Sequence, residues 1–374
     1  MKFTIARDVF DKALTVASKA IGSKSPVPVM MNLKLTLKNN ILSILGSNNE
    51  LTIRTSVNAL NGDKKVIYDI EEGSTLIMAK YLTEIIKKIE GDYISFEVID
   101  ETMVNISDNR SNFKLNSMRA EEYPEIDLDE SGTTFDVSVD DFKLLVDQTA
   151  FAASIKEQRP VLTAVNLNGG EHKLVATATD SARLARKEIN IRDVPYFSAN
   201  VPAKVLTEVE KLIENEKTVS ISVSEQKILF KVDNTLVSSR LISGDYPNTR
   251  NIVPKTFNYF LQVNAAELLA AMDRVSLLLI DKENVVKLSM SDQSVEVSAK
   301  SNQVGSAVEQ INICQYNSDR LEVSFNASYV ADAIKACRSE DVSIEFLGEM
   351  KPFVVRNVND DSQIQLITPM RTYN

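Results

Sequence analysis

The chain has 374 residues, two to three times the usual length of one domain, so we expect two or three domains. Its composition, 44% hydrophobic and 25% charged, is that of a soluble globular protein and excludes long disorder, while the net charge of −10 argues against a nucleic-acid partner on charge alone. No apolar run approaches the ~20 residues of a membrane helix, and the N-terminus lacks the apolar core of a secretory signal. Two cysteines, Cys314 and Cys337, exclude a disulfide scaffold and predict buried thiols in a reducing cytoplasm.

Six helices are predicted, each with apolar residues at three- and four-residue spacing. In chain order they span residues 7–19, 79–89, 140–153, 203–213, 264–276 and 327–337. Between them lie short runs in which apolar and polar residues alternate, as in 32–37, 93–98, 219–223 and 295–298. This alternation predicts antiparallel strands with one solvated face. Pro202 suits the first turn of the fourth helix, and Asn264 with Glu267 resembles a capping box for the fifth.

A long repeat organises these elements. The segment Ala79–Ile85 (AKYLTEI) returns 124 residues later as Ala203–Val209 (AKVLTEV), and more weakly after another 124 residues as Ala327–Ala333. A second segment, Val139–Leu144, also returns after 124 residues, but its counterpart at the N-terminus precedes it by 134. We therefore expect about ten extra residues in the first repeat, near 61–73. A period this long means whole domains, and it predicts an α+β protein of three similar domains at 1–128, 129–253 and 254–374.

Signatures of catalysis are missing. The single histidine, His172, follows two glycines in a turn-like stretch and is expected to be exposed. No phosphate-binding loop, dinucleotide fingerprint or nucleophile elbow occurs in the sequence. Two acidic clusters, 127–130 and 360–361, lie in polar, turn-rich segments, where solvated loops are expected in preference to a metal pair. The sequence predicts no enzyme, no metal site and no cofactor.

The repeat and several local motifs together resemble the bacterial replicative sliding clamp, the β subunit of DNA polymerase III. Tyr-Pro pairs recur near the ends of the first two repeats, at Glu122–Pro124 and Asp245–Pro247. The opening MKFTI, the segment Ala178–Ala185 (ATDSARLA) and the ending Ile367–Arg371 (ITPMR) are similar to family motifs. The family pattern has Gly and then His or Tyr where this chain has Ser181 and Ala182. We expect this difference to alter details of the pocket that, in this family, binds peptides of partner proteins.

The resemblance implies a homodimeric ring of six domains that encircles duplex DNA without sequence specificity, its helices lining the hole. Such a ring is a processivity factor: it tethers the replicative polymerase, is loaded by a clamp loader, binds other proteins with a clamp-binding motif, and is itself non-catalytic. A monomeric protein-binding scaffold without DNA is the alternative, and a metal enzyme that uses the acidic loops is a third possibility. The three hypotheses differ first in oligomeric state.

Charge is distributed unevenly along the chain. The six helical spans hold eleven basic and eleven acidic residues, so the remaining residues carry the whole net charge of −10. A neutral, lysine-rich helical layer is what a sliding ring requires, because strong phosphate neutralisation would hinder movement along DNA. The expected channel lysines are Lys12, Lys24, Lys80, Lys87, Lys204, Lys211 and Lys335. For any one of them, a solvated helix face is the simpler interpretation.

The resemblance also assigns a pocket for partner peptides and a joint between protomers. The pocket residues are Leu162, Thr179, Asp180, Arg183, Leu184, Pro247, Ile252, Asn326, Tyr329, Ile367, Thr368, Pro369, Met370 and Arg371. The apolar C-terminal segment needs a surface to lie on, although an edge strand would explain it equally. At the joint, the resemblance places Phe113 and Leu115 opposite Leu277 and Leu278, for each of which a core role is an equal alternative.

Overall fold

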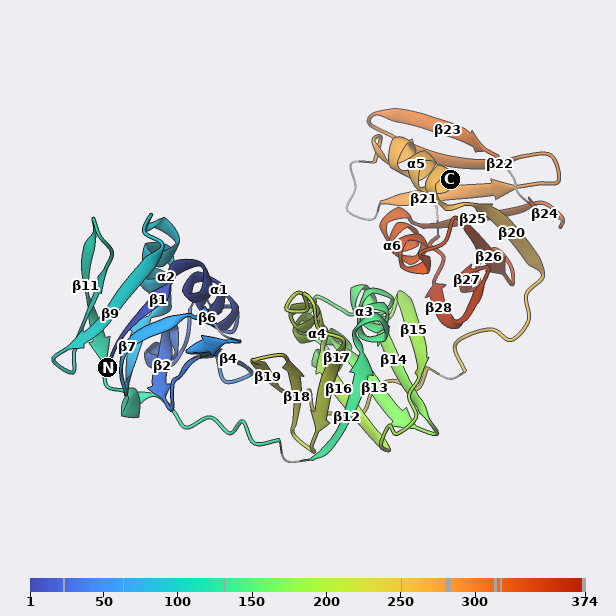
Figure 1. Ribbon diagram of the computed structural model, residues 1–374. Coiled ribbons are helices and arrows are strands. Elements are labelled where there is room, and N and C mark those ends of the chain that lie inside the picture. Colours follow the sequence, from blue (N-terminus) through green and yellow to red (C-terminus); the bar gives the residue numbers. More distant parts are fainter. Residues whose placement is uncertain are drawn as a thin grey trace. The chain divides into compact units, whose positions relative to one another are not determined.

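The computed structural model describes residues 1–22, 24–62, 64–130, 132–249, 251–279, 284–312, 315–316 and 318–371. Within these ranges there are six α-helices (Figure 1): α1 (Arg7–Ser18), α2 (Ala79–Lys88), α3 (Val139–Asp147), α4 (Ala203–Glu210), α5 (Ala265–Ser276) and α6 (Ala327–Cys337). All six overlap the predicted spans. No helix in the described part of the chain is long and apolar enough to cross a membrane.

Two helices end earlier than the apolar spacing predicted. After α3 the backbone N–H of Thr149 donates to the Val146 carbonyl, and a separate 3₁₀ turn, Ala150–Ala152, follows. After α4 the N–H of Ile213 donates to Glu210. In both places the chain tightens into bonds between residues three apart, which ends the α-helix while its apolar side chains remain on the buried side. Ile213 is still only 8% exposed, so its spacing predicted burial correctly and helix length incorrectly.

By backbone contacts the chain divides into two compact units, one of Met1–Val139 with Glu208–Leu241 and the other of Asp140–Thr207 with Ile242–Asn374. The first unit is built on a thirteen-stranded antiparallel sheet in the order β12-β17-β18-β19-β4-β3-β2-β8-β11-β10-β9-β1-β7, with a separate β5–β6 hairpin. Its strands are β1 (Lys2–Ala6), β2 (Asn32–Lys38), β3 (Ile41–Ser47), β4 (Leu51–Asn58), β5 (Leu60–Asn61), β6 (Lys64–Lys65), β7 (Ile67–Glu71), β8 (Gly73–Met78), β9 (Tyr93–Ile99), β10 (Met103–Ser107), β11 (Asn112–Met118), β12 (Thr133–Ser138), β17 (Thr218–Val223), β18 (Lys227–Val232) and β19 (Thr235–Arg240).

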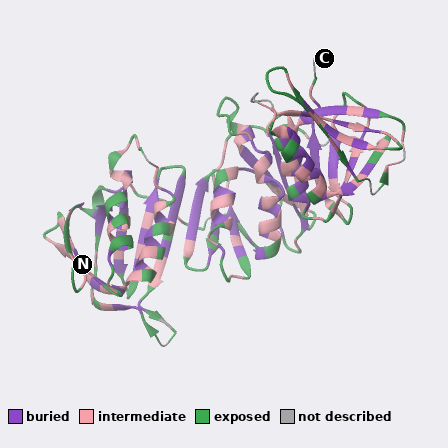
Figure 2. Ribbon diagram, turned by 90° about the horizontal axis from the view of Figure 1, so that it is seen from above, coloured by how far each residue is buried: buried purple, intermediate pink, exposed green. Residues whose placement is uncertain are grey.

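The second unit contains a nine-stranded sheet, β16-β13-β14-β15-β28-β27-β26-β20-β24, and a four-stranded sheet, β23-β22-β21-β25. Its strands are β13 (Ala164–Gly170), β14 (Lys173–Thr179), β15 (Arg183–Asn190), β16 (Phe197–Pro202), β20 (Tyr259–Asn264), β21 (Val285–Met290), β22 (Val295–Ser301), β23 (Gly305–Ile311), β24 (Gln315–Tyr316), β25 (Leu321–Asn326), β26 (Asp341–Phe346), β27 (Phe353–Asn357) and β28 (Asp360–Ile367). Figure 2 shows that buried residues follow the strands and one side of each helix, as the alternating and helical patterns predicted.

The division into two units has a simple cause in strand pairing. The middle repeat contributes β19, which pairs with β4 of the first repeat, and β15, which pairs with β28 of the third. Each half of the middle repeat therefore extends a neighbour's sheet. The repeats nevertheless have cores of their own: in the first, Phe3 stacks on Phe96 with ring centroids 4.8 Å apart and meets Phe10 edge-on. In the third, Phe353 packs against Phe325 and Phe346.

The extra residues expected in the first repeat include the β5–β6 hairpin and β7, which pairs with β1. Pro202 is the last residue of β16 and directly precedes α4, so it lies one position before the predicted first turn. Asn264 caps α5 through its side chain, which accepts from the Glu267 N–H at 3.1 Å. The Glu267 carboxylate accepts instead from Asn312, so only half of the predicted capping box forms.

The structure places His172 in an exposed turn and Asp127 of the acidic cluster in an ion pair. His172 is exposed in the turn between β13 and β14, where its φ is +61°. In the acidic cluster at 127–130, Asp127 pairs with Lys227 at 2.6 Å, and this bond lowers the pKa of the Asp127 carboxyl. Among the residues that the structure describes, no group of three or more His, Cys, Asp or Glu could hold a metal ion. Cys337 is buried, which raises its pKa to about 12; Cys314 lies outside the described residues.

Candidate functional site

An apolar cavity of about 520 Å³ lies in the second unit, where the sheets of the middle and third repeats join. Segments from several places in the sequence supply its wall: the 3₁₀ turn Pro160–Thr163 with the residue before it, the end of β14 with the start of β15, the linker after Ile242, the turn before β27, and the end of β28 with the residue after it. The lining residues are Arg159, Val161, Leu162, Thr179, Ser181, Arg183, Leu184, Pro247, Thr249, Ile252, Pro352, Leu366 and Thr368. A concave, mostly apolar site with a few polar groups is the usual form of a ligand pocket.

The floor of the cavity is a cross-strand pair. Leu184 of β15 lies opposite Leu366 of β28, and Leu366 in turn lies opposite Val354 of β27. These three side chains form a small apolar cluster, against which Val253 and Phe257 of the linker pack. Because Leu184 and Leu366 come from different repeats, the floor exists only where the two sheets are hydrogen-bonded into one.

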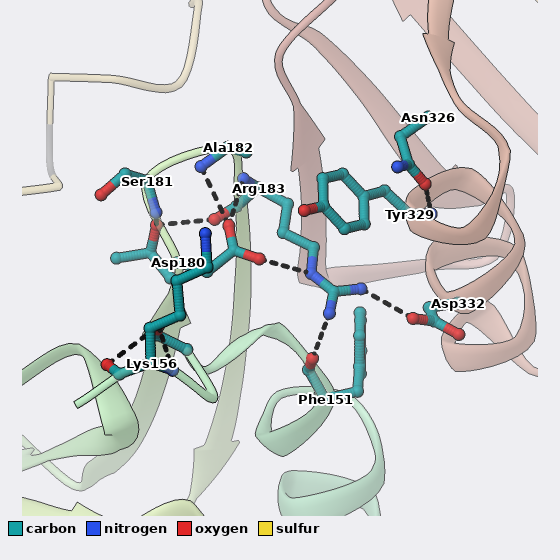
Figure 3. A network of polar contacts seen from close by, with 11 residues as sticks. Phe151, Lys156, Asp180, Ser181, Ala182, Arg183, Asn326, Tyr329 and Asp332 are labelled. Carbon is teal, nitrogen blue, oxygen red and sulfur yellow. Dashed lines mark hydrogen bonds and ion pairs between the residues drawn. The ribbon is translucent and has the colours of Figure 1, made fainter. Parts of the chain in front are cut away.

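A tight turn between β14 and β15 forms one rim. The carboxylate of Asp180 accepts the backbone N–H groups of Ala182 at 2.9 Å and Arg183 at 3.0 Å, and the Thr179 hydroxyl donates to the Arg183 carbonyl at 2.6 Å (Figure 3). Ser181 occupies the left-handed region with φ of +80°. An L-residue adopts that conformation at a cost that glycine does not pay.

Arg183 joins the two sides of the site. Its guanidinium donates to Asp180 at 3.1 Å and to the Phe151 carbonyl at 2.7 Å, both in the middle repeat. It also donates to Asp332 of α6 at 2.7 Å and lies over the ring of Tyr329, 4.5 Å from the centroid (Figure 3). The side chain is 13% exposed. A guanidinium that is largely removed from water needs such partners to offset its lost hydration.

The C-terminal segment closes the other rim. Beyond β28 the Thr368 N–H donates to the Ala182 carbonyl at 2.9 Å, and the Met370 N–H donates to the Ser324 carbonyl of β25 at 2.7 Å. Pro369 is buried between these two bonds. The apolar tail is therefore held against the sheet, as its composition predicted. In the linker, Tyr246 donates weakly to the Ala164 carbonyl at 3.5 Å, and its burial raises the pKa of the phenol above the ordinary value.

The predicted channel lysines are all exposed. On α2, Lys80 and Lys87 lie on the face opposite the buried Leu82 and Ile86, and neither forms an ion pair with any described residue. Three more of these lysines are exposed and form no ion pair with a described residue: Lys24, Lys204 and Lys335. Lys12 and Lys211 are exposed but paired, to Glu214 at 2.5 Å and to Glu208 at 2.9 Å. Burial raises the pKa of Glu208, but its bonds to Lys211 and Lys19 outweigh this and lower it overall.

The residues predicted for the joint lie beside two unpaired strand edges (Figure 1). In the first unit, β11 pairs with β10 along its length but with β8 only through Ser117 and Met118, so residues 112–116 present a free edge among the described residues. Phe113, on this stretch, is 37% exposed, and Leu115 is half-buried against the core. In the second unit, β23 is an outermost strand, and among the residues that the structure describes it pairs with β22 alone.

Leu277 follows α5 and is 81% exposed, whereas the next residue, Leu278, is half-buried. The end of α5 lies close to β23, because Arg274 of this helix pairs with Glu309 of that strand. This bond lowers the pKa of the Glu309 carboxyl. An exposed leucine and a free strand edge therefore occur together in the third repeat.

Comparison with known proteins decides which family this architecture represents. Models of the DNA polymerase III beta subunit match the chain in all three parts: the N-terminal domain over residues 1–127, the central domain over 136–248 and the C-terminal domain over 250–371. The chain belongs to the DNA polymerase III beta subunit family. Individual relatives agree with this assignment. The beta sliding clamp of Bacillus subtilis (strain 168) is 35% identical over 379 residues, and that of Staphylococcus aureus (strain N315) is 34% identical over 376 residues. Each comparison covers 100% of this chain and 100% of the relative.

A solved structure gives the same answer. The crystal structure of the DNA polymerase sliding clamp from Bacillus subtilis superposes with a TM-score of 0.95 at 34% identity and covers 100% of both chains. The resemblance drawn from the repeat and the motifs is thereby confirmed, as are the α+β class and the three clamp domains. Membership in this family carries the function of a DNA polymerase processivity factor.

Seven of the residues predicted for the pocket of this clamp line the cavity: Leu162, Thr179, Arg183, Leu184, Pro247, Ile252 and Thr368. Others support it without lining it. Asp180 and Tyr329 contact Arg183, Asn326 caps α6 by accepting from the Tyr329 N–H at 3.2 Å, and Pro369 and Met370 anchor the tail. Arg371 is exposed beyond them. Ile367 faces the core of the third domain and is 1% exposed, so it is not available to a ligand.

Six lining residues were not predicted: Arg159, Val161, Ser181, Thr249, Pro352 and Leu366. The alternation of β28 could have identified Leu366, because neighbours in a strand face opposite sides and Ile367 belongs to the core. Nothing in the local pattern could have identified Pro352, which reaches the cavity from the turn before β27.

Proposed function

We propose that two copies of this chain close head to tail into a ring around duplex DNA and that the apolar cavity receives short peptide segments of partner proteins. The catalytic subunit of the polymerase, the clamp loader and other proteins with a clamp-binding motif are the expected partners. The chain itself takes no part in chemistry. Boundaries at 128/129 and 253/254 divide the proposed protomer into its three domains.

The cavity carries the peptide part of the proposal. Its floor of Leu184 and Leu366 offers an apolar seat, and the polar rim at Thr179, Ser181 and Thr368 supplies donors and acceptors for a peptide backbone. A few apolar anchors usually dominate interfaces of this size. Overlapping peptides that span the polymerase catalytic subunit, scanned by fluorescence anisotropy, test the assignment. Saturable binding of an apolar segment supports it, and the absence of any binding peptide contradicts it.

The two free strand edges support the ring. Exposed edges invite pairing with another chain, and natural proteins usually cover them. The edge of β11 carries Lys114, whereas that of β23 carries Glu309, whose carboxylate is paired with Arg274. Pairing β11 of one protomer with β23 of the other would cover both edges and bring Phe113 and Leu115 toward Leu277 and Leu278. The same contact made twice closes a two-fold symmetric ring.

Light scattering separates this proposal from the monomeric scaffold. A ring requires twice the chain mass of 41.6 kDa. Phe113→Asp combined with Leu277→Asp should produce a folded monomer, because two carboxylates would then lie in an apolar joint. Tyr196→Asp is the matched control: Tyr196 is 80% exposed but belongs to neither edge strand, and this variant should remain dimeric. A dimer of unchanged affinity in the double variant would place the joint elsewhere.

The neutral helical layer supports enclosure of DNA without tight binding. Ordinary phosphate binders lose ~10³-fold or more in affinity between 50 and 200 mM salt. Protein loaded on a nicked circle should instead survive such salt and should leave after a single restriction cut, because sliding from an end breaks no specific contact. Replacing Lys80, Lys87, Lys204 and Lys211 together should weaken loading but not retention on the circle. Gel filtration before and after cutting measures this, and protein that stays on the linear product would refute enclosure.

A further inference from the structure

Asp332 lies outside the pocket yet contacts a residue of its wall. It belongs to α6 of the third domain, and its carboxylate accepts from Nη1 of Arg183 at 2.7 Å. Arg183 comes from β15 of the middle domain, 149 residues earlier, and is one of the residues that line the cavity. Figure 3 shows the Arg183 side chain extending from β15 toward α6, with Tyr329 and Asp332 on the far side.

The orientation of Arg183 depends on both domains. Its Nε and Nη2 are held by Asp180 and the Phe151 carbonyl, while Nη1 and one face of the guanidinium are held by Asp332 and Tyr329. A planar guanidinium with a partner on each nitrogen has one favoured position, and the loss of a charged partner frees it to move. The side chain is only 13% exposed, so water replaces the missing partner poorly.

We propose that Asp332 is a positioning residue for peptide binding. It holds the guanidinium of Arg183 against α6, so the pocket has its binding shape only while α6 is docked on the middle domain. Pocket occupancy and docking of the two domains are then linked: each favours the other by the same factor. The inference rests on the proposed peptide-binding function and adds to it a residue that the peptide does not touch.

The same junction contains a matched control. Asp147 at the end of α3 pairs with Arg338 directly after α6, so this ion pair also joins the middle and third domains. Neither residue lines the cavity or contacts Arg183. Asp147→Asn therefore removes an interdomain ion pair of the same kind without altering the wall of the pocket.

The experiment uses full-length protein and the fluorescein-labelled polymerase peptide that binds most tightly in the scan. Asp332→Asn keeps the shape of the side chain and removes its charge, and we expect the peptide to bind about five- to tenfold more weakly, as for loss of one charge-assisted hydrogen bond. Asp147→Asn should change affinity less than about twofold. With Arg183→Met already present, Asp332→Asn should have no further effect, because the residue through which it acts is gone. Asp332→Glu should restore part of the affinity.

Thermal unfolding with and without peptide separates positioning from stability. Asp332→Asn should lower the midpoint more than Asp147→Asn, because the Arg183 side chain is 13% exposed and that of Arg338 is 49% exposed, but only Asp332→Asn should reduce the peptide-induced rise. Equal weakening by both variants, or additivity of Asp332→Asn with Arg183→Met, would overturn the positioning role while leaving the pocket itself intact. If no peptide binds the unaltered protein, the proposed function and this inference both fall.

Discussion

The two junctions at which neighbouring domains share a sheet, β4–β19 and β15–β28, have the same backbone and different side chains. In the first, Leu51 and Thr52 lie opposite Ser239 and Ser238; in the second, Arg183 and Leu184 lie opposite Ile367 and Leu366. The preceding turns also correspond. Asn48 accepts from the N–H groups two and three residues ahead, at 3.0 and 2.8 Å, just as Asp180 does.

The difference lies on the face where the second junction has its cavity. There Leu184 and Leu366 form an apolar floor, whereas the first junction has Thr52 and Ser238, and the Thr52 hydroxyl is hydrogen-bonded to Ser47 at 2.7 Å. A buried hydroxyl needs such a partner, and so it offers no surface to an apolar ligand. The cavity near the first linker is smaller, about 190 Å³, and lies over β2 and β3. Two side-chain positions thus distinguish the junction with an apolar floor from the junction without one.

The opposite face of the sheet also differs between the two junctions, because it carries Leu51 at the first and Arg183 at the second. Leu51 is buried at the first junction, whereas its counterpart, Arg183, makes polar contacts to two domains at the second. An aliphatic side chain joins two domains by area alone, but a guanidinium requires each partner to be present. At the second junction, therefore, a change in one domain can alter the wall of the pocket through Arg183.

The largest expected effect comes from giving the second junction the floor of the first. Leu184→Thr with Leu366→Ser should weaken peptide binding by ~100-fold or more, because two anchors are lost together. Each leucine is 3% exposed, so we also expect about 2–5 kcal/mol of lost stability at each site. Anisotropy measures binding and circular dichroism confirms folding. Leu236→Ser, buried in the first unit, controls for lost stability and should leave binding unchanged. Retained affinity in the double variant would show that the floor is not the seat of the peptide.

A second effect follows from the C-terminus. At the first junction the chain continues beyond Arg240, whose N–H donates to Glu50, while at the second the equivalent Thr368 begins the tail. Ending the chain at Ile367 should weaken peptide binding by roughly 30-fold, since Thr368 forms part of the wall and each lost contact of this kind is worth about 1 kcal/mol or more. The dimer should persist by light scattering. Full-strength binding to the shortened chain would show that the tail is not part of the peptide site.

A third, smaller effect concerns the linker tyrosines, Tyr123 and Tyr246, which precede the prolines at the two junctions. Burial raises the pKa of Tyr123 to about 12 and raises that of Tyr246 as well. The unfolded pKa is about 10, so the stability that each buried phenol contributes is complete below pH ~10 and falls as pH rises through the folded pKa. Urea unfolding between pH ~10 and ~12 should show this loss, and Tyr123→Phe should lessen it by roughly 2 kcal/mol. An equal loss in the variant would assign the alkaline instability elsewhere.

The smallest effect compares the two left-handed turn residues, Ser181 (φ +80°) and Asn49 (φ +76°). Asparagine tolerates this region better than serine, so Ser181→Gly should raise the free energy of unfolding by about 0.5 kcal/mol and Asn49→Gly by less. Paired urea titrations can resolve this difference. Destabilisation by Ser181→Gly would mean that the Arg159–Ser181 hydrogen bond, 3.3 Å long, outweighs the relief of strain.

Local patterns in the chain were enough for much of the fold. The apolar spacing at Leu82 and Ile86 placed α2, and the spacing at Leu206 and Val209 placed α4, because helix faces repeat every three to four residues. Where a helix ends is harder to predict, as α3 shows: Gln148 and Thr149 could continue it by propensity, but the chain turns there and Gln148 donates to the Ala336 carbonyl of α6 instead. That contact joins residues 188 apart, and no local window contains it.

The sequence by itself determined three domains, their helices and the motif at 178–185, because periodicity and turn chemistry are properties of neighbouring residues. Only the tertiary structure decided that Leu184 meets Leu366 and that Arg183 meets Asp332. Pairing β15 with β28 brings together residues more than 170 positions apart, and the partner of a strand depends on which edges the finished sheets leave open. The pocket and the residue that positions its arginine belong to that pairing, which is why they emerge only from the assembled sheets.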